Sequence, residues 1–357
     1  MHGRTGSTVM EALFGKTLKE LEEITSKLSL PRFTAKQIAQ WLYKHRAESI
    51  DAMTNLSKAA RNSLAQDYEI GLQPPSSVAV SKDGTKKYLF GPEGRRVETA
   101  WIPEDGRGTL CVSSQVGCQR GCRFCMTARQ GFQANLTARE VLNQFHSLPE
   151  SNEVTNFVFM GMGEPLDNLD ALLPALEILC ADWGYGFSPK RVTVSTIGVI
   201  EGLEQVLQQS ECRLALSLHS PFPEERSQLI PAERRYPMNQ VLQFFKQEQL
   251  GKRRLTVEYL MLDQWNDSPK HSAQLARILE GTGARINLIP YHPIPDFPGK
   301  SSPASRIEAF QADLKRRGIM ATVRRSRGLD ISAACGMLST KDRLQNSTEE
   351  TNPKGSI

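Results

Sequence analysis

Residues 109–128 read TLCVSSQVGCQRGCRFCMTA, and this stretch decides how the rest of the chain is interpreted. Its first six residues form a short run that is typical of a buried strand. Three cysteines follow at once, Cys118, Cys122 and Cys125, with the spacing C-x3-C-x2-C. Because thiolates bind zinc ions and iron–sulfur clusters well, the stretch predicts a metal centre in a loop after a strand.

From residue 109 onward, short strands alternate with helical segments. The expected strands are residues 109–114, 154–160, 191–196, 213–218, 255–262, 285–290 and 321–325, and the expected helices are residues 137–148, 169–180, 202–209, 238–249, 268–280 and 305–317. Strands separated by helices of this length imply a parallel sheet with right-handed crossovers. The predicted fold class is therefore α/β, with a partial (β/α)6 barrel over residues 109–339. A doubly wound open sheet is the competing architecture.

The remainder of the chain divides into three parts. Residues 1–73 carry apolar side chains at helical spacing and are expected to form a small helical domain. Thr34, with Gln37 three residues later, is the predicted N-cap of one of its helices. In residues 74–108 the apolar period changes to two, which predicts a connecting β-hairpin or small sheet. Residues 340–357 are polar and are expected to form a disordered tail.

The composition excludes several classes of protein. Of the 357 residues, 39% are hydrophobic and 23% are charged, which rules out a wholly disordered chain. No apolar run reaches the ~18 residues of a transmembrane helix, and the N-terminus lacks the apolar core of a signal peptide, so we expect a cytoplasmic protein with no membrane partner. An odd number of cysteines, seven, argues against a disulfide framework. No heptad or repeat pattern occurs, which favours a monomer.

The chemistry of the cysteine loop favours an iron–sulfur cluster over other metal sites. A structural zinc site takes four protein ligands, and no further Cys or His pair follows Cys125. Three thiolates on a cubane leave one iron free to bind a substrate or cofactor, which is typical of a catalytic cluster rather than an electron carrier. The alternatives are a zinc ion with a distant fourth ligand, as in a zinc-stabilised RNA-binding module without enzymatic activity, and three free thiols.

Basic residues give weaker support for a nucleic-acid partner. The net charge is +5, and short basic clusters occur at 95–96, 252–254, 315–317 and 324–327. Each cluster alone is typical of a solvated surface. Several of them on one side of the barrel mouth would form a track for phosphates.

The motifs resemble those of two nested families. C-x3-C-x2-C with Phe124 before the last cysteine resembles the radical S-adenosylmethionine (SAM) enzymes. Longer stretches resemble the RlmN/Cfr family of RNA adenosine methyltransferases, from about Leu13 to about Leu338. These stretches are ETAWIPEDGRGTLCVSSQVGC (98–118), FMGMGEPLDN (159–168), SLHSPFPEERSQLIP (217–231), MLDQWNDS (261–268) and GLDISAACGML (328–338).

The resemblance implies a radical SAM barrel with an RNA-contacting accessory domain at residues 1–73. The implied substrate is a specific adenosine of 23S rRNA, and also the adenosine 3′ of the tRNA anticodon. The implied product is methylated at carbon 2, because the GMGEP and FCMTARQGF stretches are closer to the carbon-2 branch than to the Cfr-like branch, which methylates carbon 8. Carbon 2 of adenine offers no nucleophile to an ordinary methyl transfer, so a radical is needed. A low-potential electron donor such as a flavodoxin is the implied reductant.

The resemblance also assigns roles to residues. Cys118, Cys122 and Cys125 would bind a [4Fe-4S] cluster. The SAM pocket would contain Gly163, Glu164, Ser195, Ser217, Leu218, His219 and His292, and His292 stands where the family usually has Asn. Cys335 would take a methyl group from one SAM, and a second SAM would supply the radical that activates this methyl group. Cys111 would form a transient disulfide with Cys335 to release the product, with Glu98 as proton acceptor.

Overall fold

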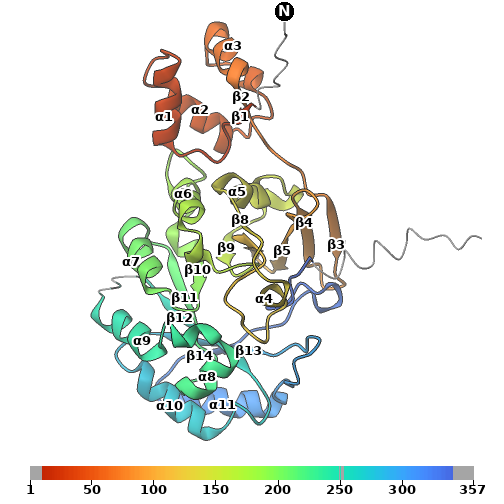
Figure 1. Ribbon diagram of the computed structural model, residues 1–357, viewed down its shortest axis with the longest axis vertical. Helices are drawn as coiled ribbons and strands as arrows, with labels where there is room; N and C mark the ends of the chain where they lie inside the picture. The colour runs from red at the N-terminus through yellow and green to blue at the C-terminus, as the bar shows by residue number, and fades with distance from the viewer. Residues whose placement is uncertain (1–9, 249, 251–252, 341–357) are drawn as a thin grey trace, which may run out of the picture.

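The computed structural model describes residues 10–248, 250 and 253–340, and a helical N-terminal part sits at one end of a larger α/β body (Figure 1). The predicted tail, apart from Thr340, lies outside the described residues. The N-terminal part contains α1 (Leu18–Lys27), α2 (Thr34–Tyr43) and α3 (Lys58–Asp67), and β1 (Glu11–Ala12) pairs in parallel with β2 (Tyr68–Glu69). The small helical domain expected at the N-terminus is therefore present.

The predicted N-cap at Thr34 is wrong. Phe33 precedes α2 with helical backbone angles, and no side chain caps this helix. Thr34 is instead the first residue of α2, and its N–H donates to the carbonyl oxygen of Pro31. A turn over residues 31–34 thus leads directly into α2. A capping box occurs at α1, where the Thr17 side chain accepts from the N–H of Glu20.

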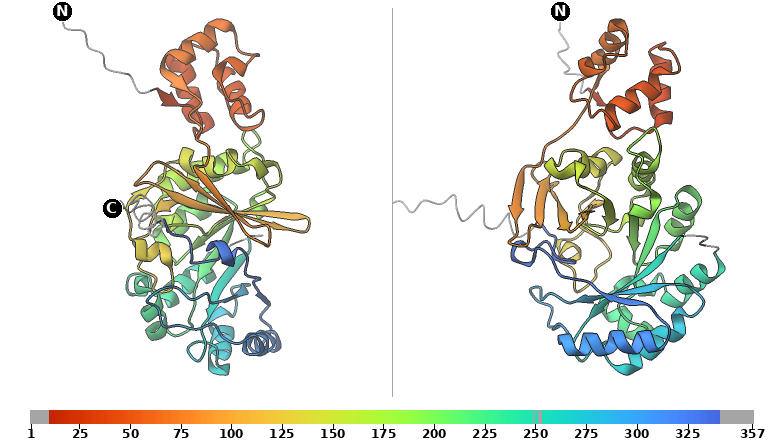
Figure 2. Two further views of the ribbon diagram at one scale, coloured as in Figure 1. Left: turned by 90° about the vertical axis from the view of Figure 1, so that its right-hand side faces the viewer. Right: turned by 180° about the vertical axis from the view of Figure 1, so that it is seen from behind.

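The central sheet has ten strands in the order β14-β13-β12-β11-β10-β9-β6-β5-β4-β3. Its strands from β6 to β14 are parallel, and they are β6 (Arg107–Cys111), β9 (Asn156–Phe159), β10 (Val192–Thr196), β11 (Arg213–Ser217), β12 (Leu255–Met261), β13 (Arg285–Pro290) and β14 (Ala321–Val323). All of the expected strands are thus confirmed. The parallel part of the sheet curls into a partial barrel, which Figure 2 shows from two further sides. In the strand order β14 lies at one edge and is not a neighbour of β6, so the barrel stays open.

The connecting segment extends this same sheet. Antiparallel strands β3 (Ser77–Val80), β4 (Lys86–Phe90) and β5 (Val97–Glu104) continue it beyond β6. The reason is a tight turn at Asp105 and Gly106, which the sequence reading did not use, and which folds β6 back onto β5. The hairpin therefore forms one wall of the barrel body instead of a separate connection.

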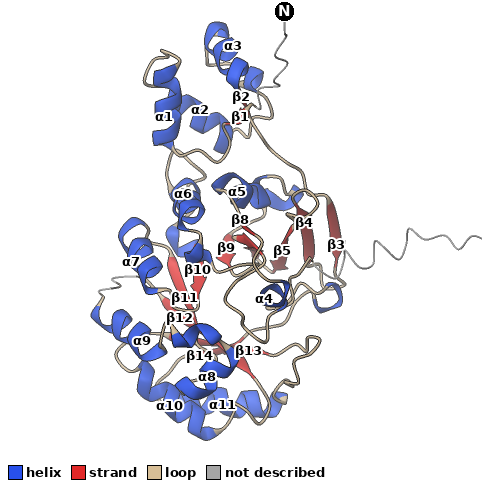
Figure 3. Cartoon of the chain, viewed as in Figure 1, coloured by secondary structure: helices blue, strands red, loops and turns tan. Residues whose placement is uncertain are grey.

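Helices surround the parallel strands on the outside (Figure 3). The six expected helices are confirmed, and they are α5 (Ala138–His146), α6 (Leu169–Cys180), α7 (Ile200–Gln209), α9 (Met238–Gln247), α10 (Pro269–Leu279) and α11 (Ala304–Arg316). Elements that the sequence reading did not predict are α4 (Met126–Gln130), α8 (Pro223–Leu229) and the small pair β7 (Gln115–Val116) with β8 (Ala134–Asn135). None of the helices in the described ranges is both long and apolar enough to cross a membrane.

Candidate active site

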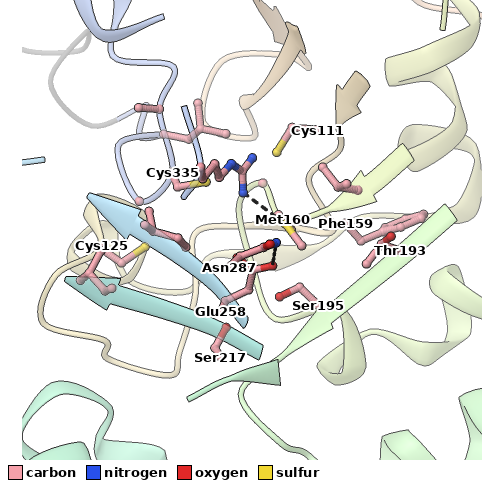
Figure 4. A pocket seen from close by; sticks show the side chains of 18 of the residues that line it. Cys111, Cys125, Phe159, Met160, Thr193, Ser195, Ser217, Glu258, Asn287 and Cys335 are labelled. Carbon is pink, nitrogen blue, oxygen red and sulfur yellow. Dashed lines mark hydrogen bonds between the residues drawn. The ribbon is translucent and has the colours of Figure 1, made fainter. Parts of the chain in front are cut away.

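A cavity of about 680 Å³ lies inside the partial barrel (Figure 4). It is lined by most of the predicted site residues, namely Cys111, Cys118, Cys122, Cys125, Gly163, Glu164, Ser195, Ser217, His219, His292 and Cys335. They come from the strands of the barrel and from the loops that follow them, so residues spread over more than 200 positions meet in one place. Glu98 and Leu218 are not among the residues that line this cavity.

The cysteine loop folds tightly around the cavity. A side chain on Gly117 would place its first carbon 1.6 Å from the carbonyl oxygen of Gly131, and the φ of Gly117 is +74°, so only glycine fits. Burial, together with the neighbouring Cys125 and Cys118, raises the pKa of the Cys122 thiol. The three thiols therefore share one space, where bound metal cations would offset the charge of three thiolates.

In the described residues, Cys118, Cys122 and Cys125 do not converge on a position for one metal ion. In the part of the chain that the structure describes, no three His, Cys, Asp or Glu side chains surround a position for one metal ion. A zinc ion requires such convergence, because all of its ligands lie at roughly 2.0–2.3 Å. A cubane binds each cysteine through a different iron atom, so its ligands need not converge on a point.

Glu164 is held rigidly after β9. Its carboxylate oxygens accept hydrogen bonds from the N–H of Leu166 at 3.1 Å and of Ile197 at 3.0 Å. Burial raises the pKa of Glu164 to about 7, although these two backbone donors act in the opposite direction. The preceding Gly163 has a φ of +99° and packs against Gln115, where a side chain would clash. The remaining lone pairs of the carboxylate are available to a cationic ligand in the cavity.

His219 supplies an uncharged ring to the same cavity. Its Nδ1 accepts a hydrogen bond of 2.9 Å from the N–H of Leu260, so the neutral ring carries its hydrogen on Nε2. Burial, and secondly Arg226, lower the pKa of His219 to about 3, which keeps the ring neutral near pH 7. Ser195 on β10 and Ser217 on β11 add hydroxyl groups to this wall.

Leu218 and His292, the other two residues of the predicted SAM pocket, lie in different surroundings. The Leu218 side chain is buried in the hydrophobic core, and its carbonyl oxygen accepts from Nε of Arg226 at 3.0 Å. His292 is half-buried and lines the cavity, and its Nε2 lies 2.7 Å from the hydroxyl of Ser326. A hydroxyl of the chain thus already engages one nitrogen of this imidazole.

Cys111 and Cys335 lie on one side of the cavity, and both are free thiols (Figure 4). Cys111 ends β6, whereas Cys335 lies in the segment after β14. Burial, and then the neighbouring Cys335, raise the pKa of Cys111 to about 12, whereas Arg324 acts to lower it. The two thiols are thus close enough to affect each other, and a guanidinium group lies beside them.

The segment that carries Cys335 is attached to the cysteine loop. The N–H of Met126 donates to the carbonyl oxygen of Gly336 at 2.7 Å, and the hydroxyl of Thr127 donates to the carbonyl oxygen of Leu338 at 2.7 Å. These bonds fix the position of Cys335 relative to Cys125.

Glu98 lies behind this segment, on β5. Its carboxylate is fully buried, with the Lys87 ammonium at 3.0 Å and the N–H of Ser339 at 3.1 Å. Lys87 also donates to the carbonyl oxygen of Ser332 at 3.2 Å. The pair therefore anchors both ends of the Cys335 segment to the sheet. The role of Glu98 as proton acceptor stays a prediction.

Sequence reasoning missed a polar group in the barrel interior. Asn287 on β13 donates to Glu258 on β12 at 3.0 Å and accepts from Thr322 at 2.6 Å. Burial raises the pKa of Glu258, whereas Arg324 acts to lower it. The signal was available, because a Glu in the middle of the apolar strand 255–261 requires a partner or a ligand.

Comparisons with known proteins agree with this geometry. Residues 112–276 match the model of the radical SAM superfamily, and residues 12–70 match the ribosomal RNA large subunit methyltransferase N-terminal domain. A probable dual-specificity RNA methyltransferase RlmN from Parabacteroides distasonis is 52% identical over 92% of this chain and 96% of that protein. A dual-specificity RNA methyltransferase RlmN from Alcanivorax borkumensis is 40% identical over 94% of this chain and 92% of that protein.

The chain belongs to the RlmN family. A solved structure of a radical SAM methyltransferase from Sphaerobacter thermophilus superposes with a TM-score of 0.85 at 40% identity, and covers 92% of this chain and 99% of that one. The partial barrel and the N-terminal domain of this RlmN-family chain are therefore confirmed at the level of fold.

Membership of the RlmN family, within the radical SAM superfamily, implies two cofactors, SAM and a [4Fe-4S] cluster. The residues present fit both. The loop offers three cysteine ligands in a shared space, and a cluster held there would have one iron without a protein ligand. The buried Glu164 carboxylate provides an acceptor for the ammonium group of SAM in the same cavity.

Proposed function

We propose that this chain is a dual-specificity RNA methyltransferase that methylates carbon 2 of adenosine in 23S rRNA and of the adenosine 3′ of the tRNA anticodon. The observation that carries the proposal is the meeting of Cys111 and Cys335 with the three-cysteine loop in one cavity. The names of the relatives, which describe dual-specificity RNA methyltransferases, support it. They give no support to methylation of carbon 8 or to a zinc-stabilised binding module.

In this proposal the chain binds its cofactors through two walls of the cavity. Cys118, Cys122 and Cys125 hold the cluster. The SAM pocket is made by Gly163, Glu164, Ser195, Ser217, the backbone at Leu218, His219 and His292. When bound there, the cluster and SAM supply the radical that an unreactive aromatic carbon requires.

Cys335 carries the methyl group, and Cys111 resolves the product. After the methyl carbon is bonded to the adenine, the Cys111 thiolate attacks the sulfur of Cys335. The S–S bond forms as the C–S bond breaks, and the carbon keeps the electron pair of that bond and takes up a proton to become the methyl group of the released base. Burial disfavours the Cys111 thiolate, and Arg324 offsets part of that cost by stabilising negative charge beside it. Glu98 accepts the proton lost from the adenine in this scheme, which requires the segment around Ser339 to shift.

We further propose a stoichiometry of SAM use, an electron donor, an oligomeric state and a cellular location. Two SAM molecules are consumed per methyl group transferred, one as methyl donor and one as radical source. A low-potential reductant such as a flavodoxin supplies electrons, and the chain acts as a monomer in the cytoplasm, where rRNA and tRNA are found. Counting deoxyadenosine and S-adenosylhomocysteine per methylated adenosine tests the stoichiometry, because the proposal requires one of each.

The decisive experiment is mass spectrometry of nucleosides from RNA treated with the reconstituted protein. The proposal requires 2-methyladenosine from both 23S rRNA and tRNA fragments. The formation of 8-methyladenosine would show instead that the chain methylates carbon 8.

A further inference from the structure

The cavity has a second end, at the amino-terminal edge of the parallel strands. Arg107 begins β6, Arg213 begins β11, Arg285 begins β13, and Arg254 directly precedes β12. Parallel strands begin at the same edge of a sheet, so these four arginines lie at the same edge. All four line the cavity, and we call this end of it the arginine mouth.

The register of the sheet brings two of these arginines together. Leu214 pairs with Leu255, and the N–H of Leu214 donates to the carbonyl oxygen of Arg254 at 3.2 Å, so Arg213 and Arg254 lie side by side on neighbouring strands. Like charges opposite each other on adjacent strands destabilise a sheet. Burial, followed by the charges of Arg254, Arg107, Arg191 and Arg285, lowers the pKa of Arg213, which indicates that the guanidinium groups repel one another.

One carboxylate lies at this mouth, on Glu104, which stands opposite Arg107 in the register of β5 and β6. Within the described residues, none of the four arginines forms an ion pair with this or another carboxylate. Among the described residues, the Arg107 side chain donates a hydrogen bond to the hydroxyl of Thr109, at 3.1 Å. A polyanion would therefore stabilise this end of the sheet.

The cavity is open to solvent at this mouth and along the edge strand β14. The cavity-lining residues that are exposed are Glu104, Arg107, Arg254, Thr322, Val323 and Arg325. They lie at the amino-terminal edge or along the gap between β14 and β5–β6. The opposite end is covered by the cysteine loop and the Cys335 segment, which are joined through Met126 and Gly336.

The interior between the two ends is polar. Barrels that serve only as cores are filled by branched apolar side chains. Here Thr109, Thr193, Thr256, Asn287 and Glu258 line the passage from the arginines to Cys111. Such a passage can accept a nucleobase, which presents hydrogen-bonding groups along its edge.

We propose that Arg107, Arg213, Arg254 and Arg285 bind the phosphates that flank the target adenosine, and that the base enters the barrel through this mouth. The inference rests on the proposed function for the identity of the base. A guanidinium group binds a phosphate through two parallel hydrogen bonds to its oxygens. Binding the two phosphates that flank the target favours the unstacked nucleotide that the reaction needs. An acidic electron donor fits less well, because the cysteine loop lies at the other end of the cavity.

The test measures RNA binding by the cluster-loaded protein without turnover. The probes are a fluorescent anticodon stem-loop and an unrelated single-stranded RNA of equal length. The variant is R213Q/R254Q, and the control is R234Q/R235Q, which removes the same charge from exposed positions that do not line the cavity. Phosphate contacts carry no sequence information, so both RNAs should lose affinity alike.

We expect R213Q/R254Q to weaken binding of both RNAs by about tenfold or more and to reduce the slope of log affinity against log salt by about 1–2. SAM affinity should stay unchanged, and the control should shift RNA affinity less than twofold. R213K/R254K should recover most of the salt slope. Unchanged RNA affinity in R213Q/R254Q, equal losses in the control, or absence of RNA binding by the wild type would overturn the inference. If the wild type binds RNA through these arginines but methylates no adenosine, the proposed function fails and this binding site stands.

Discussion

The N–H of Met126 donates a hydrogen bond of 2.7 Å to the carbonyl oxygen of Gly336. Each of these residues directly follows a cysteine of the site, Cys125 in the cluster loop and Cys335 in the C-terminal segment. One hydrogen bond thus joins the loop that would hold the cluster to the segment that would hold the methyl group. The spacing between Cys125 and Cys335 is therefore set by a backbone contact rather than by their side chains.

The contact next to it can be tested by mutation. Thr127→Val removes the hydroxyl that donates to Leu338 at 2.7 Å and leaves a buried carbonyl oxygen unsatisfied. We expect methylation to fall about tenfold or more, because small displacements of reacting groups cost large factors in rate. Because the Thr127 side chain also hydrogen-bonds the Cys125 thiol, iron content is measured in each variant, and Thr127→Ser should retain both iron and activity. Full activity in Thr127→Val would show that the anchor is dispensable.

Variants of the two cysteines that are proposed to be catalytic should lose activity in different ways. Cys335→Ala should give neither product nor adduct, because the methyl carrier is lost. Cys111→Ala should leave the protein covalently attached to RNA through Cys335, because no second thiol can release the product. A denaturing gel with labelled RNA distinguishes the two, with the double alanine variant as control. Normal turnover by Cys111→Ala would remove it from the mechanism.

SAM binding should depend on pH through Glu164. Its pKa is raised to about 7 by burial, so the carboxyl is neutral below that pH and charged above it. A carboxylate accepts from the SAM ammonium more strongly than a carboxylic acid does, so affinity should rise between pH 6 and pH 8. Titration calorimetry should show this rise in the wild type and a flat profile in Glu164→Gln. A rise of equal size in the variant would assign the dependence to another group.

The buried pair of Lys87 and Glu98 should govern stability. Lys87→Met leaves the Glu98 carboxylate buried without its cation, which costs about 3–5 kcal/mol in comparable pairs. We expect a clear drop in the midpoint of urea unfolding, with partial recovery in Lys87→Met/Glu98→Gln. If the single Lys87→Met variant is as stable as the wild type, another group compensates the charge and the anchoring role is wrong.

The parallel part of the fold was predictable because each strand carries its own signal. A short apolar run such as 213–218 is followed by polar residues and a helix, and the carboxyl ends of parallel strands share one edge. This rule alone brings Glu164, Ser195, Ser217 and the cysteine loop together.

The rest depends on contacts that no local pattern encodes. Thr127 and Leu338 are separated by 211 positions, and the sequence does not reveal their hydrogen bond. The burial of Glu98 likewise requires Lys87 and the C-terminal segment to be placed first. Leu218 could have been excluded as a cavity contact, because neighbouring strand residues point to opposite faces and Ser217 already faces the cavity.

The most direct test of the account uses anaerobically reconstituted protein that contains about four iron and four sulfide ions per chain. It is supplied with SAM, a low-potential reductant and an RNA that contains the target adenosine, and the nucleosides are analysed by mass spectrometry. The account predicts 2-methyladenosine with the wild type and none with Cys335→Ala. An unmodified adenosine with the cluster-loaded wild type, or a methyl group at carbon 8, would contradict it.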